Sequence, residues 1–168
     1  MPAVIPTGYR LRVGSGLERA LLVQFMQRTY QEIELVDSYG HLAQTVEQYF
    51  SRETPLWWVD CLTTLGLAHP SATSAARSHR AVACLWMGTA IDQVYGDQHA
   101  HIFLLYVLPE HRRQGIGRAL MHQAEVWARA RGDRQIGLQV FESNQAALNL
   151  YQGLGFQTKS LWMVKPLT

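Results

Sequence analysis

The chain has 168 residues, of which 48% are hydrophobic and 17% charged. This composition excludes a disordered chain, and the length suits one domain with its own core, over residues 1–168. The formal net charge of +2 is too small to indicate nucleic-acid binding. Because no apolar run is long enough to cross a membrane and no leader pattern is visible, we expect a cytoplasmic protein with neither nucleic acid nor membrane as a partner.

Hydrophobic periodicity divides the chain into strands and helices. Strict alternation, as in Tyr9, Leu11 and Val13, predicts a strand, and apolar residues three or four positions apart predict a helix. In chain order we expect a strand at 9–13, helices at 17–33 and 41–50, strands at 56–62, 81–90 and 98–108, a helix at 116–132, a strand at 136–140, a helix at 144–153, and a closing strand through Leu161 and Met163. This order predicts an α/β (α+β) fold in which helices cover the faces of a mixed sheet, with no second domain.

Local signals add detail to these elements. Gly96 lies in a turn that predicts an antiparallel hairpin between the strands on either side of it. Gly132 predicts the end of the long helix, and Ser143 or Asn144 predicts the N-cap of the last helix. The two N-terminal helices are expected to pack side by side. Residues 63–80 are rich in Ser, Thr and Ala, and we expect a long loop there, which is either a lid or binding loop or else disordered or plain surface.

Four residues with versatile side chains fall inside predicted strands. Cys61 and Cys84 lie in apolar runs, which indicates buried thiols rather than a disulfide. Trp57 and Trp58 could line a substrate pocket, although at least one of them is expected in the core.

The stretch 105–118 has the ingredients of an anion site. Pro109 stops a strand, because proline has no N–H for the ladder, and Gly115 begins a helix. The first N–H groups of a helix have no internal partner, and the helix dipole adds positive potential there. Because glycine has no Cβ, a phosphate could approach the backbone closely. Three arginines, Arg112, Arg113 and Arg118, surround this turn, and a solvated basic turn is the alternative interpretation.

Two common nucleotide motifs do not fit this turn. A Walker A loop needs Lys-Ser/Thr after its last glycine, where Arg118-Ala119 stands, and a dinucleotide fingerprint needs a small residue where Leu120 stands. The pattern present is Arg112-x-x-Gly115-x-Gly117, just after Val107-x-Pro109. It resembles the pyrophosphate loop of the GNAT superfamily, the acetyl-CoA-dependent N-acetyltransferases. Downstream, Asn144-x-x-Ala147-x-x-x-Tyr151-x-x-x-Gly155-Phe156 resembles that family's C-terminal signature.

The resemblance implies a GNAT-like fold, with a mixed, mostly antiparallel sheet between helices on both faces, and acetyl-CoA as co-substrate without a metal. In that family the strand carrying the Val-x-Pro element separates from the next strand, and the pantetheine arm lies in the cleft, here between 98–108 and 135–141. A backbone N–H near Val107 or Leu108 would polarise the acetyl carbonyl. The residues implied to bind the coenzyme are Leu105, Tyr106, Val107, Arg112, Arg113, Gln114, Gly115, Ile116, Gly117, Arg118 and Asn144. The side chains of 105–108 are equally suited to a core, and Asn144 to an N-cap.

The resemblance also implies catalytic candidates. Tyr151 matches the tyrosine that can give a proton to the leaving thiolate; a core tyrosine is the alternative. Ribosomal-protein alanine N-acetyltransferases carry a glutamate base where this chain has Gln139, which cannot take a proton. In histone-type acetyltransferases the base stands where this chain has His101, whose neutral imidazole is available at pH 7. Since a bulge can reverse strand parity, His101 either faces the cleft or is an ordinary half-exposed histidine. Glu142 and Asp60 are the remaining carboxylate candidates.

The resemblance implies direct transfer of an acetyl group from acetyl-CoA to a primary amine of a small molecule or peptide, in a ternary complex. Neutralising a lysine at pH 7 costs about 4–5 kcal/mol, while roughly a tenth of an α-amine is already neutral. An enzyme without a strong base therefore either suits α-amines and other amines of low pKa or deprotonates its acceptor through water. The alternative, favoured by Gln139 and opposed by Tyr151, is a non-catalytic acyl-CoA-binding or regulatory module. His99 and His101 have metal-like spacing, but no third ligand is near in sequence. A homodimer is a further expectation of the resemblance, while the acceptor and the length of the acyl group are left open.

Overall fold

The computed structural model describes residues 4–33, 38–62 and 81–167. In chain order its elements are β1 (Tyr9–Val13), the 3-10 turn η1 (Gly16–Glu18), α1 (Arg19–Glu32), α2 (His41–Tyr49), β2 (Leu56–Cys61), β3 (Ala81–Ile91), β4 (Gln98–Val107), the 3-10 turn η3 (Pro109–His111), α4 (Ile116–Arg131), β5 (Ile136–Leu138) and α5 (Gln145–Gly153). The predicted loop at 63–80 lies outside the described residues.

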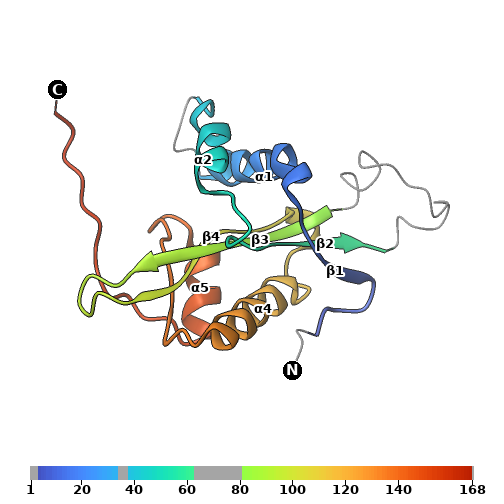
Figure 1. The fold of residues 1–168 in the computed structure, drawn as a ribbon. Helices are drawn as coiled ribbons and strands as arrows, with labels where there is room; N and C mark the ends of the chain where they lie inside the picture. Colours follow the sequence, from blue (N-terminus) through green and yellow to red (C-terminus); the bar gives the residue numbers. More distant parts are fainter. Residues whose placement is uncertain (1–3, 34–37, 63–80, 168) are drawn as a thin grey trace.

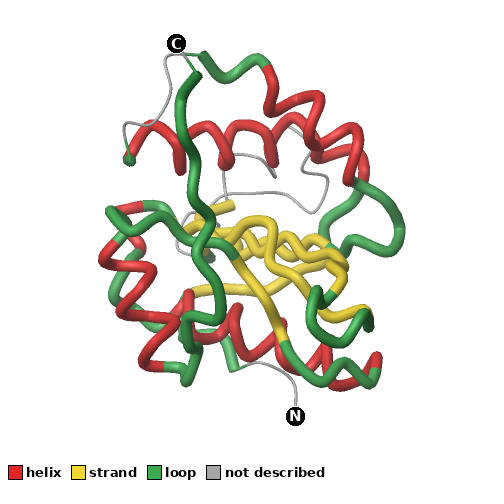
Figure 2. Tube along the Cα trace, turned by 90° about the vertical axis from the view of Figure 1, so that its left-hand side faces the viewer, coloured by secondary structure: helices red, strands yellow, loops and turns green. Residues whose placement is uncertain are grey.

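The strands form one mixed sheet between two layers of helices, which confirms the predicted fold class. They lie in the order β1-β2-β3-β4-β5, antiparallel except for the parallel pair β4 and β5. Helices α1 and α2 pack together on one face, and α4 and α5 cover the other (Figures 1 and 2). Each face has its own buried cluster, so the core is double. Every helix of the described residues is too short or too polar to span a membrane.

The two tryptophans of β2 belong one to each half of this core. Trp57 packs against Trp127 of α4, and Trp58 packs against Phe25 of α1. Side chains alternate across a strand, so neighbouring residues necessarily enter opposite layers. Both tryptophans are buried, so both belong to the core.

The two cysteines are buried thiols and form no disulfide within the described part of the chain, as predicted. Burial raises the pKa of the Cys84 thiol, which keeps it protonated and unreactive.

A bulge in β4 decides which way its side chains face. The register with β3 shifts between Trp86, opposite Leu104, and Met87, opposite Ile102, so Phe103 is the extra residue. Ile102 consequently lies in the cluster beneath α4, whereas Leu104 lies in the cluster beneath α1. The predicted hairpin of β3 and β4 is confirmed, with this irregularity inside it.

The predicted closing strand is wrong. Residues 156–167 form neither strand nor helix, and Leu161 and Met163 are exposed. Alternation supplies two faces, but a strand also needs a partner for its N–H and C=O groups. Among the described strands β5 pairs only with β4, and it ends at Leu138 rather than at 140 as expected.

Candidate active site

The pairing of β4 with β5 stops halfway along β4. The last matched residues are Ile102 and Leu138, while β4 continues to Val107. The bulged residue Phe103 follows the last pair directly, and a bulge bends its strand. The two strands therefore separate where the sequence motif predicted a cleft. Beyond that point the β5-facing edge of β4 has no strand partner among the described residues.

Two backbone N–H groups of β4 face this open edge. The N–H of Leu108 donates to the Val82 carbonyl of the β3 side at 2.8 Å, so it is not available to a ligand. Because backbone groups alternate between the two edges of an antiparallel strand, the N–H groups of Leu105 and Val107 point the other way. Leu105 lies nearer the point of separation. The sequence offered the backbone N–H of Val107 or Leu108 as the donor to the acetyl carbonyl. Of these two, the N–H of Val107 faces the open edge, and the N–H of Leu105 is a second donor there.

The turn after β4 is shaped to gather backbone N–H groups. Arg113 has φ 61° and Gly115, the N-cap of α4, has φ 87°. A left-handed residue at such a turn aims successive N–H groups at one point, which is an anion-binding arrangement. The N–H groups of Ile116, Gly117 and Arg118 have no carbonyl partner within the helix. Since the Ile116 side chain is buried, its contribution to a ligand is limited to the backbone.

Gly117 has a second reason to be glycine. A Cβ there would lie 3.3 Å from the Leu150 side chain of α5, so the absence of a side chain also lets α4 and α5 approach closely. Gly115 and Arg118 also line a cavity of about 590 Å³. This cavity gives a bulky ligand room beside the N-terminus of α4.

Arg112 braces the turn. Its Nε donates to the Val107 carbonyl at 2.8 Å, and its Nη2 donates to both carboxylate oxygens of Glu32 at 2.7 and 2.8 Å. The Tyr106 hydroxyl donates to the same carboxylate. The charge of Arg112 is thus shared with Glu32. Arg113 and Arg118, by contrast, are exposed and form no ion pair with any described residue.

Sequence reasoning missed two residues that hold this turn. Glu32 is the last residue of α1, and no pattern in the sequence connects it with Arg112. The hydroxyl of Tyr9, in β1, donates to Gln114 Oε1 at 2.7 Å and lies 2.9 Å from His111 Nδ1. The side chain of Gln114 is therefore turned toward β1, which leaves its backbone to face a ligand.

Helix α5 carries the downstream motif. Asn144 Oδ1 accepts the Ala147 N–H at 3.1 Å, which confirms the N-cap. Tyr151, two turns later, is 9% exposed and packs against Phe156. Its hydroxyl makes no hydrogen bond with any described residue. Burial raises the pKa of Tyr151 to about 12, so the hydroxyl keeps its proton throughout the physiological range.

The bulge places His101 on the α1–α2 face of the sheet. Its ring lies 5.5 Å from that of Phe103, which in turn contacts Tyr49 of α2. Burial, with a smaller effect from His99, lowers the pKa of His101, so the imidazole is neutral at pH 7. His101 precedes Leu105 by four residues, a separation of about 13 Å along an extended strand, so it could reach a reaction centre there only through water.

Aromatic rings surround the approach to this face. Tyr30 of α1 lies 6.3 Å from Phe141, which follows β5, and 6.3 Å from His41 of α2. Together with Phe103 and Tyr49, they line the side of the separated strands that α1 and α2 cover.

The two carboxylate candidates differ sharply in their surroundings. Asp60 is buried, and its carboxylate accepts hydrogen bonds from Arg12 Nε at 3.0 and 3.1 Å and from Arg10 Nη2 at 3.4 Å. Both oxygens are therefore occupied by structural ion pairs. Glu142 is exposed beyond β5. Within the described ranges no group of three His, Cys, Asp or Glu side chains is arranged to hold a metal ion.

Comparisons with known proteins show the family and the fold. The profile described as "Acetyltransferase (GNAT) family" matches residues 24–156. The [ribosomal protein bS18]-alanine N-acetyltransferase of Escherichia coli K12 is 40% identical over 72 residues, 43% of this chain and 48% of that protein. The aminoglycoside N(6')-acetyltransferase type 1 of Acinetobacter haemolyticus is 33% identical over 86 residues, 49% of this chain and 59% of that protein. The chain thus spans about half the length of these relatives.

The fold has matches among solved structures. An acetyltransferase of Clostridium acetobutylicum, solved with acetyl-CoA, superposes with a TM-score of 0.70 over 94% of this chain and 96% of that one, at 15% identity. The separated strands, the left-handed turn and the matching profile define an acyltransferase-type fold. The chain belongs to the GNAT acetyltransferase family.

Proposed function

We propose that the protein is an acetyl-CoA-dependent N-acetyltransferase that transfers the acetyl group directly to a primary amine in a ternary complex. The observation that carries this proposal is the open edge of β4. It presents the N–H groups of Leu105 and Val107 directly beside the left-handed turn at the N-terminus of α4. The open edge of β4 can hold the thioester, and the turn beside it can hold the diphosphate.

The turn at 112–118 would hold the pyrophosphate. Backbone N–H groups from Arg113 to Arg118 supply the donors, and the side chains of Arg113 and Arg118 supply unshared positive charge. Arg112 fixes the turn against Val107 and Glu32 rather than offering its full charge. Asn144 caps α5, and in this proposal it would also contact the coenzyme.

The reaction needs one bond formed and one broken. The amine nitrogen attacks the thioester carbonyl carbon, and the carbonyl oxygen gains charge that the Leu105 N–H stabilises. The C–S bond then breaks, the Tyr151 hydroxyl donates a hydrogen bond to the leaving thiolate, and the thiolate takes its proton from the solvent. The proton released from the amine passes to His101 through water on the α1–α2 face. Acetylated amine and free coenzyme A are the products.

The acceptor class follows from the weakness of the base. The two relatives are named for acetylating an alanine of a ribosomal protein and an aminoglycoside, both of which offer primary amines. Gln139, which cannot take a proton, and a half-buried histidine that acts through water supply little driving force for deprotonation. We therefore propose an amine of low pKa, such as a peptide α-amine, in preference to a lysine side chain.

A pair of peptides tests this proposal. Each contains one free amine, either an N-terminal alanine or a lysine in an N-terminally blocked chain, and release of free coenzyme A thiol is followed at pH 7. We expect release with the α-amine peptide at least tenfold faster than with the lysine peptide. A marked lysine preference would contradict the acceptor class. Binding of acetyl-CoA without thiol release from any peptide or aminoglycoside would instead favour the non-catalytic module.

A further inference from the structure

The turn before α4 contains a residue in an unfavourable backbone conformation. Arg113, at φ 61°, is the one non-glycine residue with a left-handed φ in the described part of the chain. A side chain strains this conformation, which persists where the surrounding structure holds it in place. The shape that gathers the N–H groups of residues 113–118 therefore depends on the contacts that the neighbours of Arg113 make.

Both neighbours of Arg113 are tied to other elements by side-chain hydrogen bonds. On one side, Gln114 Oε1 accepts the hydroxyl of Tyr9, in β1, at 2.7 Å. On the other side, Arg112 Nη2 donates to both carboxylate oxygens of Glu32, the last residue of α1. The strained residue thus lies between one tie to β1 and another to α1.

Glu32 fixes the orientation of the Arg112 guanidinium. The carboxylate accepts Arg112 Nη2 at 2.7 and 2.8 Å, while Arg112 Nε donates to the Val107 carbonyl at 2.8 Å. The same carboxylate accepts the Tyr106 hydroxyl, and Arg112 Cζ lies 5.4 Å from the centre of the Tyr106 ring. The third nitrogen, Nη1, forms no hydrogen bond with a described residue, so its two N–H donors are not engaged by this network.

The pair of Glu32 and Arg112 is too exposed to act chiefly through stability. The two side chains are 36% and 38% exposed, and ion pairs in such surroundings contribute little to the free energy of unfolding. A carboxylate beside an anion-binding turn also repels an anionic ligand. What remains is the geometry that Glu32 imposes on Arg112.

We propose that Glu32 is a positioning residue for the coenzyme: by holding Arg112, it keeps the turn at 112–118 in the shape that binds the pyrophosphate. This role rests on the proposed function. The charge of Glu32 and its geometric effect act in opposite directions. Removing the negative charge alone would tighten the binding of an anionic coenzyme, whereas releasing Arg112 removes the preorganisation of the turn and weakens binding.

Calorimetry with acetyl-CoA measures this sign. We expect Glu32→Gln to weaken binding about tenfold and to raise the KM for acetyl-CoA by a similar factor, with kcat at saturation within about threefold of wild type. Glu18→Gln is the matched control, because it removes a carboxylate that pairs with Arg12 at 2.6 Å, and it should leave the affinity unchanged. Equal or tighter binding by Glu32→Gln overturns the role.

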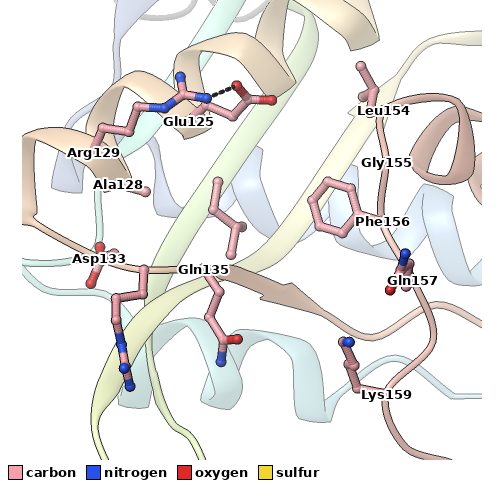
Figure 3. A pocket seen from close by; sticks show the side chains of 12 residues that line it. Glu125, Ala128, Arg129, Asp133, Gln135, Leu154, Gly155, Phe156, Gln157 and Lys159 are labelled. Carbon is pink, nitrogen blue, oxygen red and sulfur yellow. Dashed lines mark hydrogen bonds and ion pairs between the residues drawn. The ribbon is translucent and has the colours of Figure 1, made fainter.

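A double-mutant cycle tests whether Glu32 acts through Arg112. Arg112→Met should weaken acetyl-CoA binding about as much as Glu32→Gln, and the double variant should bind no more weakly than either single variant. Arg129→Met is the control and should keep the wild-type affinity, because Arg129 pairs with Glu125 at 2.7 Å further along α4 (Figure 3). Losses that add in the double variant overturn the role.

The same titrations separate this role from the proposed function. A wild-type chain that binds no acetyl-CoA overturns both, whereas equal binding by the wild-type chain and Glu32→Gln overturns the role of Glu32 alone. If Glu32→Gln does not fold, Tyr106→Phe decides, because it removes the other hydrogen bond to Glu32 and keeps the ring. An affinity about threefold weaker in Tyr106→Phe supports the role, and an unchanged affinity overturns it.

Discussion

Replacing Tyr151 with phenylalanine isolates the role of its hydroxyl in the departure of coenzyme A. The ring is buried beside Phe156, and phenylalanine preserves this packing. The hydroxyl has no hydrogen-bond partner among the described residues, so its loss should change the free energy of unfolding by less than about 1 kcal/mol. Any larger effect on turnover then belongs to the reaction.

The raised pKa limits what this hydroxyl can do. Tyr151 has a pKa of about 12, whereas a free thiol has a pKa near 8.5, so complete proton transfer to the thiolate would be uphill by about 5 kcal/mol. A hydrogen bond to the developing charge is the favourable role. Such a bond contributes about 1.5–3 kcal/mol, which predicts a roughly 10- to 160-fold fall in kcat for Tyr151→Phe.

Steady-state thiol release, with the preferred amine saturating, measures this change. The KM for acetyl-CoA should stay within about twofold, because the bond forms mainly as the thiolate departs. Tyr95→Phe, which removes an exposed hydroxyl in the β3–β4 hairpin, is the matched control and should leave kcat unchanged. A kcat within twofold of wild type for Tyr151→Phe would refute this role. A fall in the kcat of the wild-type enzyme near pH 9 that is absent from the variant would also refute this role.

Three further predictions follow from the same structure. Gly115→Ala and Gly132→Ala each place a side chain at a left-handed φ, at opposite ends of α4. Both variants should lose about 1–2 kcal/mol of unfolding free energy, measured with urea. Only Gly115→Ala should weaken the binding of acetyl-CoA, measured by calorimetry, by tenfold or more. Asp60→Asn removes the buried carboxylate that pairs with Arg12, which keeps Glu18 as its ion-pair partner. It should lose about 1–3 kcal/mol in the same unfolding assay, with unchanged acetyl-CoA affinity; an altered affinity would contradict its structural role. Because burial lowers the pKa of His101, the acid limb of kcat/KM should fall below pH 6.5 and disappear in His101→Gln; an identical pH profile in that variant would remove His101 from the reaction.

Much of the fold could be predicted because local and global signals agree. The limits of α4 follow from glycines that the structure places at left-handed φ at both ends, and Asn144 caps α5 as its side chain allows. The closing strand failed for a different reason. Alternation of Leu161 and Met163 describes side-chain faces but says nothing about whether a partner edge is within reach.

The site was predictable where it depends on consecutive residues and not where it depends on packing. The turn at 112–118 could be read from glycine spacing. The face of His101 could not, because a single bulged residue, Phe103, decides it. The bracing of Arg112 by Glu32 joins residues far apart in the chain, and only the folded structure brings them together. The sequence also could not show that the Leu108 N–H is unavailable to a ligand, because this N–H donates to the carbonyl of Val82, which is distant in the chain.

Binding of acetyl-CoA at the N-terminus of α4 is the central claim, and a thermal melt measures it most directly. A ligand at 100 times its Kd adds about 2.7 kcal/mol, which is a rise in Tm of roughly 5–11 °C for a domain of this size. We predict this rise for the wild-type chain and its loss in an Arg113→Glu, Arg118→Glu double variant whose Tm without ligand is unchanged. An unshifted wild-type melt at millimolar acetyl-CoA, or an equal shift in the double variant, would contradict the account.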